Sequence, residues 1–371
     1  MHVLVVPDSF KGSLSAAEVC GLVGEAFVAR GATTRLIPVA DGGEGTVDAM
    51  LLAAGGERRV DTVQGPYGQP LDAARAILPD GTALVELAQA AGLTLVGEDR
   101  RAGDTTTYGV GEQIRAAAAE GARRIIVGIG GSATNDGGCG AAAACGVRFL
   151  DDEANEFVPV GRTLTDVAVI DLAGLDPAVA AAEIVVMCDV DNPLTGEHGA
   201  AAVFGPQKGA DPETVAQLDA GLRHLAEVVR RDVHVDVEGL DGAGAAGGMG
   251  GGLVAFLGGT LRRGIDVVLD AVRFEEQLAG ADAVVTGEGS FDSQSLRGKV
   301  VHGIAARAQP AGVPVHVLAG RVDEGVLEAA RTVGVASATA ITPPGVPIEQ
   351  AIAEARTNLA RAAAALAERL V

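Results

Sequence analysis

Short apolar runs alternate with polar, glycine-containing segments at the start of this chain. The runs at 3–6 and 34–39 have the length and composition of buried strands. After the first, Ser15 and Glu18 match a capping box and predict a helix to about residue 29; a second helix is expected over 46–54. Strand, loop and helix repeated in this order are typical of a parallel α/β sheet.

The pattern changes near residue 56 and returns at 281. Between them, short alternating runs separated by Gly-Pro and Asp-Gly turns predict an antiparallel or mixed sheet. From 281 onwards, apolar strands again alternate with helical segments. We therefore predict an α/β protein in which 1–60 plus 281–371 form one doubly wound domain, with a mixed α/β domain, 61–280, inserted into it.

The stretch 123–146 carries the densest chemical signal in the chain. An apolar strand, 125–127, is followed by seven glycines between Gly128 and Gly146 and by an alanine run, 141–144, that reads as a helix. Glycine lets a backbone approach a ligand closely, and the N–H groups at a helix start attract anions. We expect the loop to hold a polyphosphate or a small acid.

The same stretch also fits a dinucleotide fingerprint. Gly128-x-Gly130-x-x-Ala133 follows a strand, and Asp151 lies about 20 residues on, where a ribose-binding carboxylate belongs. The segment 135–138 interrupts the helix that such a site needs, which favours the phosphate loop. A nicotinamide site and a purely structural turn remain alternatives.

Charge and composition exclude several classes of function. The 371 residues carry a formal net charge of −21, which argues against a surface for nucleic acid or anionic membranes. The four cysteines form no CxxC pair, as in a reduced, cytoplasmic protein. The amino terminus does not resemble a signal peptide, and no apolar run is long enough to span a bilayer. A small anionic substrate would need local cations, so the scarce lysines Lys11, Lys208 and Lys299 are informative.

Polar residues follow one predicted strand after another. In open α/β sheets, ligands bind outside the carboxyl ends of the strands. The residues at these ends are Asp8, Asp41, Ser132, Asp136, Asp189, Asp191, Glu288, Asp292 and Arg321.

Some of these residues suggest particular chemistry. Asp189 and Asp191 would share one side of an extended segment and suit Mg²⁺, although both could be turn caps. Asp41 is a candidate general base or a helix cap. Arg297 and Lys299 could bind an anion or only begin a helix. No P-loop motif is present, since Val300 follows Gly298-Lys299.

Six long motifs together resemble the bacterial glycerate kinase family, in order and over essentially the whole chain. They are PDSFKGSLSAAEV (7–19), PVADGGEGTVDAM (38–50), GIGGSATNDGGCGAAAA (128–144), CDVDNPLTGEHGAAAVFGPQKGA (188–210), GAGAAGGMGGGL (242–253) and VVTGEGSFDSQSLRGKV (284–300). The resemblance implies phosphoryl transfer from ATP to D-glycerate, giving 2-phosphoglycerate in preference to 3-phosphoglycerate. It also implies a flavodoxin-like domain with a second domain inserted into it.

With that reaction in view, we assign expected roles. Catalytic roles fall to Asp41, Lys11 and Lys299, and substrate binding falls to Arg297, Asp8 and Ser9. ATP is expected on Gly130, Gly131, Ser132, Asn135 and Asp136, and Mg²⁺ on Asp189 and Asp191. The partners are small molecules, with the chain a monomer or homodimer. An NAD(P)-dependent oxidoreductase of a small hydroxy acid and a metabolite-binding regulatory protein are the alternative functions.

Overall fold

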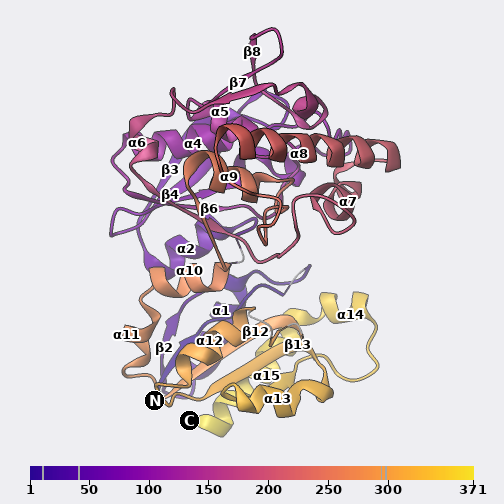
Figure 1. The fold of residues 1–371 in the computed structure, drawn as a ribbon. Coiled ribbons are helices and arrows are strands. Elements are labelled where there is room, and N and C mark those ends of the chain that lie inside the picture. Colours follow the sequence, from indigo (N-terminus) through magenta and orange to yellow (C-terminus); the bar gives the residue numbers. More distant parts are fainter. Residues whose placement is uncertain (11, 41, 294, 297–298) are drawn as a thin grey trace. The chain divides into compact units, whose positions relative to one another are not determined.

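The structure, a computed structural model, describes every residue except Lys11, Asp41, Gln294, Arg297 and Gly298 (Figure 1). The chain divides into two compact units. The first unit comprises Met1–Ala40, Asp48–Gly55 and Ile265–Val371, and the second comprises Asp41–Val47 and Gly56–Gly264. The predicted domain boundary at 281 thus falls later in the chain than the change of unit at Ile265.

A five-stranded sheet forms the centre of the first unit, in the order β14-β13-β12-β1-β2, and every neighbouring pair is parallel. Counted along the unit, this is the 2-1-3-4-5 order of flavodoxin-like sheets, which confirms the predicted fold class. The strands are β1 (His2–Val5), β2 (Thr33–Leu36), β12 (Ala283–Phe291), β13 (Val315–Val322) and β14 (Val335–Ala340).

Helices cover both faces of this sheet (Figure 1). The inward side chains of Val3 and Val5 pack with α1 (Ala16–Val28) and α15 (Ala355–Leu370) in one core cluster. The predicted capping box begins α1: the Ser15 hydroxyl accepts from the Glu18 N–H, and the Glu18 side chain accepts from the Ser15 N–H. The unit's other helical segments are α2 (Thr46–Ala54), α10 (Gly264–Ala271), α11 (Phe274–Leu278), α12 (Val300–Ala308), η4 (Glu324–Val326), α13 (Leu327–Thr332) and α14 (Ile348–Ala353).

The second unit is built on a six-stranded mixed sheet in the order β11-β10-β6-β5-β4-β3. The pairs from β11 to β5 are parallel, and the pairs β5–β4 and β4–β3 are antiparallel, as the turn-rich sequence predicts. A small sheet, β8-β7-β9, is added to it. The strands are β3 (Glu57–Gln64), β4 (Pro70–Ile77), β5 (Ala83–Glu86), β6 (Arg124–Gly128), β7 (Arg148–Leu150), β8 (Glu156–Phe157), β9 (Val169–Asp171), β10 (Glu183–Met187) and β11 (Thr260–Arg262).

Helices with small residues on their buried faces pack around this second sheet. Ala141 and Ala142 of α5 are fully buried or nearly so, and a Cβ on Gly111 of α4 would lie 2.2 Å from the Ala141 carbonyl oxygen. Small side chains therefore set the close approach of the two helices. The helical segments are α3 (Leu87–Ala91), η1 (Leu93–Leu95), α4 (Tyr108–Ala119), α5 (Cys139–Ala144), η2 (Gly161–Asp166), α6 (Pro177–Ala180), α7 (Ala200–Phe204), η3 (Pro206–Lys208), α8 (Pro212–Asp232) and α9 (Met249–Leu257).

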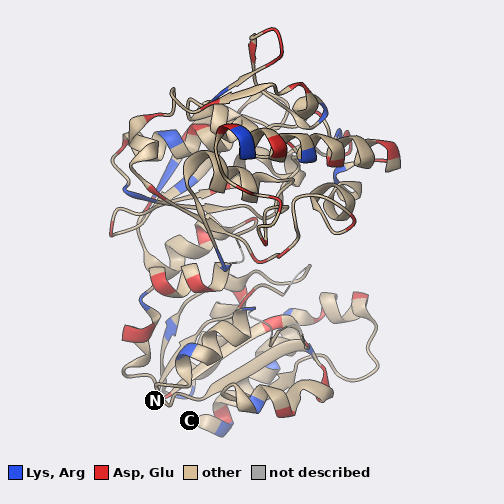
Figure 2. Cartoon of the chain, in the orientation of Figure 1, with Lys and Arg blue, Asp and Glu red and all other residues tan. Residues whose placement is uncertain are grey.

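Charged residues are distributed over both units, with Lys and Arg interspersed among Asp and Glu rather than gathered in a continuous basic band (Figure 2). Over the described residues, this view shows charges of both signs on each of the two units. Over the same residues, none of the helices combines the length and apolar character needed to cross a bilayer.

Candidate functional site

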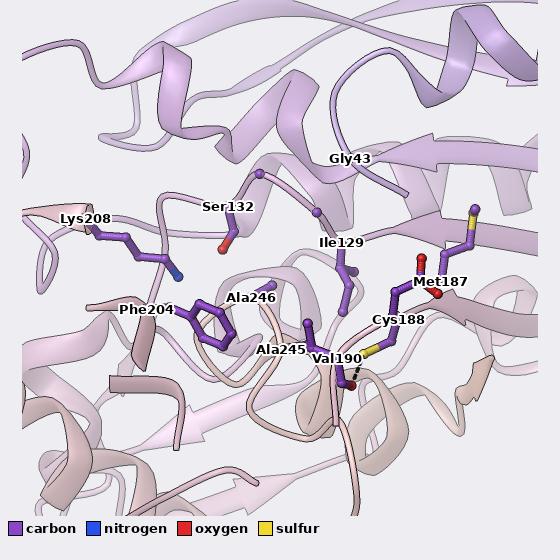
Figure 3. Close-up of a pocket in the computed structure, with 13 residues that line it drawn as sticks. Gly43, Ile129, Ser132, Met187, Cys188, Val190, Phe204, Lys208, Ala245 and Ala246 are labelled. Carbon is purple, nitrogen blue, oxygen red and sulfur yellow. Dashed lines mark hydrogen bonds between the residues drawn. The ribbon is translucent and has the colours of Figure 1, made fainter. Parts of the chain in front are cut away.

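A pocket of about 220 Å³ lies in the second unit beside the glycine-rich stretch singled out in the sequence (Figure 3). Its lining mixes loop backbone, apolar side chains and two charged residues. The lining residues are Gly43, Ile129, Gly130, Gly131, Ser132, Met187, Cys188, Asp189, Val190, Phe204, Lys208, Ala245 and Ala246. The volume is below the roughly 300–1,000 Å³ of pockets that enclose whole drug-sized ligands, so it suits one part of a larger molecule.

The loop after β6 is packed against a second glycine loop that precedes α2. The N–H of Gly130 donates to the carbonyl oxygen of Gly42 at 2.9 Å. A Cβ on Gly130 would lie 2.6 Å from the Cα of Gly43, and one on Gly128 would lie 2.6 Å from the oxygen of Gly42. Glycine is therefore required at these positions by backbone packing as well as by any ligand.

The buried carboxylate of Glu86 fixes the second loop. It accepts hydrogen bonds from the N–H groups of Gly45 and Val47, each at 3.0 Å, and it is fully buried at the end of β5. Burial raises the pKa of Glu86, while the two backbone donors act in the opposite direction. Glu86 was not predicted as a functional residue, because no local motif marks a side chain that caps a helix from a distant strand.

Two residues of the glycine loop that line the pocket, Gly131 and Ser132, have backbone N–H groups without an acceptor among the described residues. The neighbouring backbone is paired: Leu93 N–H donates to Gly131 O at 2.8 Å, and Ala133 N–H donates to Ala91 O at 2.9 Å. Over the described residues, the N–H groups of Gly131 and Ser132 donate no such bond. With Gly131 at φ +70°, this segment forms a turn whose free donors suit an anion.

The start of α5 does not offer the anion site predicted for it. Asp136 occupies that place itself: its carboxylate accepts from the N–H of Gly138 at 3.1 Å and of Gly140 at 3.2 Å. Thr107 supplies two further donors, its N–H at 2.7 Å and its hydroxyl at 2.8 Å. Asp136 is fully buried, and burial raises its pKa against the effect of these donors. We interpret Asp136 as an internal cap.

Asn135, also expected to contact a nucleotide, is fully buried. Its Nδ2 donates to the Ala102 carbonyl at 3.1 Å, and its Oδ1 has no hydrogen-bond partner among the described residues. Of the five residues predicted to bind ATP, the pocket lining contains Gly130, Gly131 and Ser132. The loop thus separates into a surface part and a buried supporting part.

Lys208 contributes a buried cation to the pocket. Its side chain extends from η3 and is 2% exposed, and its Nζ donates to the Thr134 carbonyl oxygen at 2.6 Å. Burial lowers the pKa of the Lys208 ammonium to about 7, and the nearby Asp136 acts in the opposite direction. From the sequence, Lys208 stands out only as one of three lysines, in a glycine-containing segment, and no role is predicted for it.

The two predicted metal ligands lie in the loop after β10. The strand ends at Met187, so Asp189 and Asp191 are not on the extended segment that the sequence suggested. Asp189 lines the pocket, and its Oδ1 accepts from the Gly264 N–H at 2.8 Å. Within the described part of the chain, no group of three or more His, Cys, Asp and Glu is arranged to hold a metal alone. Asp189 and Asp191 are both exposed, and one or two carboxylates are the protein ligands that Mg²⁺ usually takes together with phosphate oxygens.

The first unit gathers a second set of predicted residues around Glu288. This residue lies near the carboxyl end of β12, is 8% exposed, and has an Oε1 without a partner among the described residues. Burial raises the pKa of Glu288 to about 7; Ser295 and Lys299 lower it, and the charges of Asp8 and Asp292 raise it. Asp8 and Lys299, both named from the sequence, are therefore electrostatic neighbours of one buried carboxyl.

Other predicted residues cannot be placed in this way. Ser9 follows Asp8, whose Oδ1 accepts from the Ser9 N–H at 2.6 Å. Lys11, Asp41 and Arg297 lie outside the described residues, so their roles remain predictions.

The dinucleotide alternative lacks its expected geometry. A loop separates β6 from α5, which begins only at Cys139, and α5 is six residues long. Asp151 lies in a turn after β7, where its carboxylate accepts from the N–H groups of Glu153 and Asn155 at 3.0 and 2.8 Å. That carboxylate caps its own turn rather than facing the loop ligand.

Comparison with known proteins gives one consistent result. Residues 3–371 match the model of the glycerate kinase family. The chain is 45% identical over 367 residues to a glycerate kinase of Bacillus subtilis (strain 168), covering 98% of this chain and 96% of the relative. It is 46% identical to the glycerate 2-kinase of Escherichia coli (strain K12), over 88% of this chain and 87% of that one.

A solved structure agrees. The crystal structure of a protein assigned as glycerate kinase 2 from Salmonella typhimurium LT2 superposes with a TM-score of 0.87 and 43% identity. The alignment covers 100% of this chain and 98% of the other.

Proposed function

The chain belongs to the glycerate kinase family, and from this premise we propose that it transfers the γ-phosphoryl group of ATP to the 2-hydroxyl of D-glycerate. The product is 2-phosphoglycerate. The single observation that carries the placement of ATP is the pocket of the second unit, in which the free N–H groups of Gly131 and Ser132 share one cavity with the Lys208 side chain.

Phosphoryl transfer depends mostly on positioning and on neutralisation of charge. Gly131 and Ser132 hold the phosphate chain by their backbone N–H groups and the Ser132 hydroxyl, while Gly130, whose N–H donates to the Gly42 carbonyl, lines the pocket beside them. Gly42 and Glu86 keep the neighbouring loop against them, so the donors are fixed before the ligand arrives. Asn135 and Asp136 support the loop from inside. A preorganised donor set of this kind costs little reorganisation when charge develops.

Asp189 and Asp191 would hold Mg²⁺ through their carboxylate oxygens. The ion neutralises phosphate charge when bound, and it usually takes one or two carboxylates together with phosphate oxygens and water. The Oδ1 atom of Asp189 also accepts from the Gly264 N–H, so Asp189 would contribute to the metal site and to the local backbone at once. In this proposal, either carboxylate oxygen of Asp191 can bind Mg²⁺.

On the acceptor side, Arg297 holds the glycerate carboxylate, and Asp8 and Ser9 bind other parts of the substrate. A guanidinium can hold a carboxylate by two parallel N–H···O bonds. Lys299 or Lys11 faces the transferred group. Two carboxylates are candidates to accept the proton of the glycerate hydroxyl. Asp41 is the candidate predicted from the sequence. Glu288 is the candidate from the structure, because it is buried and its Oε1 has no hydrogen-bond partner among the described residues.

A product assay tests the proposal directly. The protein is incubated with ATP, Mg²⁺ and D-glycerate, ADP is measured, and the phosphorylated product is examined by ³¹P NMR. Phosphate on carbon 2 couples to one proton and gives a doublet, whereas phosphate on carbon 3 couples to two and gives a triplet. No ADP above the no-glycerate control would refute the kinase, and a triplet would correct the position. Reduction of a nicotinamide instead would support the oxidoreductase alternative.

We place the reaction in the cytoplasm, because the four free cysteines suit a reducing compartment and three of them are buried.

A further inference from the structure

Lys208 has more hydrogen-bonding capacity than the described structure uses. An ammonium carries three N–H donors. One donates to the Thr134 carbonyl oxygen at 2.6 Å, and over the described residues no second acceptor bonds to Nζ. The side chain is 2% exposed and lines the pocket, so its remaining donors are withheld from bulk water. Figure 3 shows the Lys208 ammonium and the Ser132 hydroxyl directed towards the same space, with Phe204 beside them.

The charge of Lys208 also lacks an available counter-ion. Asp136 attracts the ammonium, but four donors from Thr107, Gly138 and Gly140 already occupy the Asp136 carboxylate. Among the described residues, no carboxylate forms an ion pair with Lys208. A buried charge without a close partner is costly, and an anion that enters the pocket removes that cost.

We propose that Lys208 is a phosphate-binding residue of the ATP pocket, acting with the free N–H groups of Gly131 and Ser132 as one anion cradle. The inference rests on the proposed function, since it names the residue that recognises the nucleotide at that same site. Lys208 keeps its bond to Thr134 O while a second N–H donates to a phosphate oxygen. It thereby connects the ligand to the glycine loop.

The surroundings favour phosphate over the glycerate carboxylate at this position. The cradle combines backbone donors with a point charge, which matches the several oxygens of a phosphate, while planar carboxylates are matched by a guanidinium. The pocket also has apolar side chains in its lining, from Ile129, Met187 and Val190, interrupted by the Asp189 carboxylate. The apolar side chains suit the uncharged part of a nucleotide, and the Asp189 carboxylate disfavours a free glycerate carboxylate.

The test measures direct binding of adenosine, AMP, ADP and ATP to wild-type protein and to Lys208→Met by titration calorimetry, without glycerate. We expect the variant to lose about tenfold to a hundredfold in affinity for ATP, the range of one charge-assisted hydrogen bond, and to bind adenosine as before. Arg100→Met is the matched control: Arg100 is an exposed cation that donates to the Gln207 carbonyl but does not line the pocket. Its nucleotide affinities should not change.

Lys208→Gln is a second variant that keeps the test decisive if Lys208→Met fails to fold. The glutamine amide can still donate to Thr134 O, but it carries no charge. We expect it to melt cooperatively and to show the same selective loss of ATP affinity.

Three results would overturn the proposal. Unchanged ATP affinity in folded Lys208→Gln would remove the contact. An equal loss for adenosine and ATP would show that Lys208 only shapes the pocket. A rise in KM for D-glycerate with unchanged ATP binding would assign the cation to the acceptor. Wild-type protein that binds no adenine nucleotide would instead refute the proposed function itself, so the two failures are distinguishable.

Discussion

Thr107 holds the buried carboxylate of Asp136 with two hydrogen bonds, one from its N–H at 2.7 Å and one from its hydroxyl at 2.8 Å. The same hydroxyl accepts from the Ala141 N–H at 2.9 Å. Because Asp136 also accepts from Gly138 and Gly140, the first turn of α5 is closed by protein groups. In the described part of this loop, the N–H groups without an acceptor are those of Gly131 and Ser132, and the proposed anion site therefore lies earlier in the loop.

Asp136→Asn should destabilise the protein by about 3 kcal/mol, because the amide places N–H donors against backbone N–H donors and each charge-assisted bond contributes about 1.5–3 kcal/mol. Denaturant unfolding with and without ATP measures this. Asp152→Asn, in an exposed turn, is the control and should be neutral. Normal stability combined with weak ATP binding would instead support the direct nucleotide contact that the sequence suggested for Asp136.

Gly131→Ala should weaken ATP binding beyond its effect on folding. At φ +70° an alanine costs about 1–2 kcal/mol, although its Cβ would meet Ala88 at an ordinary 3.6 Å. Gly121→Ala is the control. It has the same kind of backbone strain at φ +95°, its Cβ would lie in open space, and Gly121 does not line the pocket. Calorimetry with ATP separates them: only the Gly131 variant should lose affinity, and the bulkier Gly131→Val should lose more. Equal affinities in both alanine variants would make the Gly131 turn structural.

The fold was largely predictable because central strands of both sheets, such as β1, β6 and β10, are short apolar runs followed by clear turn signals. The capping box of α1 and the strand–helix alternation of the first unit are local patterns, and local patterns are what sequence reasoning reads. The run at 34–39, expected as a buried strand, is shorter and more exposed in the structure: β2 ends at Leu36, and its residues are exposed or partly buried.

The candidate site was less predictable because its decisive contacts are long-range. Asp136 resembles a ligand-binding residue in the sequence because it lies among glycines. In the structure, however, its carboxylate accepts a hydrogen bond from Thr107, which is 29 positions away. Glu86 caps a loop 39 positions earlier. Lys208 reaches Thr134 across 74 positions. Only the scarcity of lysine pointed to Lys208, and scarcity does not say what a side chain contacts.

Asp191→Asn should lower kcat by orders of magnitude at saturating ATP while the unfolding midpoint stays near that of wild type, since Asp191 is exposed. The amide removes a charged Mg²⁺ ligand, so the Mg²⁺ concentration for half-maximal rate should rise as well. Asp189→Asn is harder to interpret, because Asp189 also accepts a hydrogen bond from the Gly264 N–H and the substitution would change that contact as well. Unchanged turnover across a Mg²⁺ titration would remove Asp191 from the metal site.

Arg297→Lys should raise KM for D-glycerate about tenfold to a hundredfold, since a single ammonium replaces the paired bonds of a guanidinium. KM for ATP should change little. Steady-state kinetics with each substrate varied in turn gives both constants. An effect confined to ATP would move Arg297 to the nucleotide, and no effect on either substrate would leave it as a solvated residue near the start of α12.

Glu288 offers a test in which stability and activity move in opposite directions. Burial raises its pKa from 4.5 to about 7, with Asp8 and Asp292 raising it and Ser295 and Lys299 lowering it. A raised carboxyl pKa in the folded state means that the unfolded state releases the proton first. The stability that the protonated carboxyl contributes is therefore complete below about pH 4.5 and lost as the pH rises through about 7.

Glu288→Gln removes this titration because its amide stays neutral. The variant should match wild type in unfolding free energy near pH 5 and exceed it at pH 8. If ionised Glu288 takes the hydroxyl proton, wild-type kcat/KM should rise with pH through about 7, and the variant should lose about 10²–10⁴-fold in kcat together with that rising limb. Glu328→Gln, on an exposed position of α13, should change neither property. A more stable variant with undiminished kcat would leave Asp41 as the group that acts on the acceptor hydroxyl.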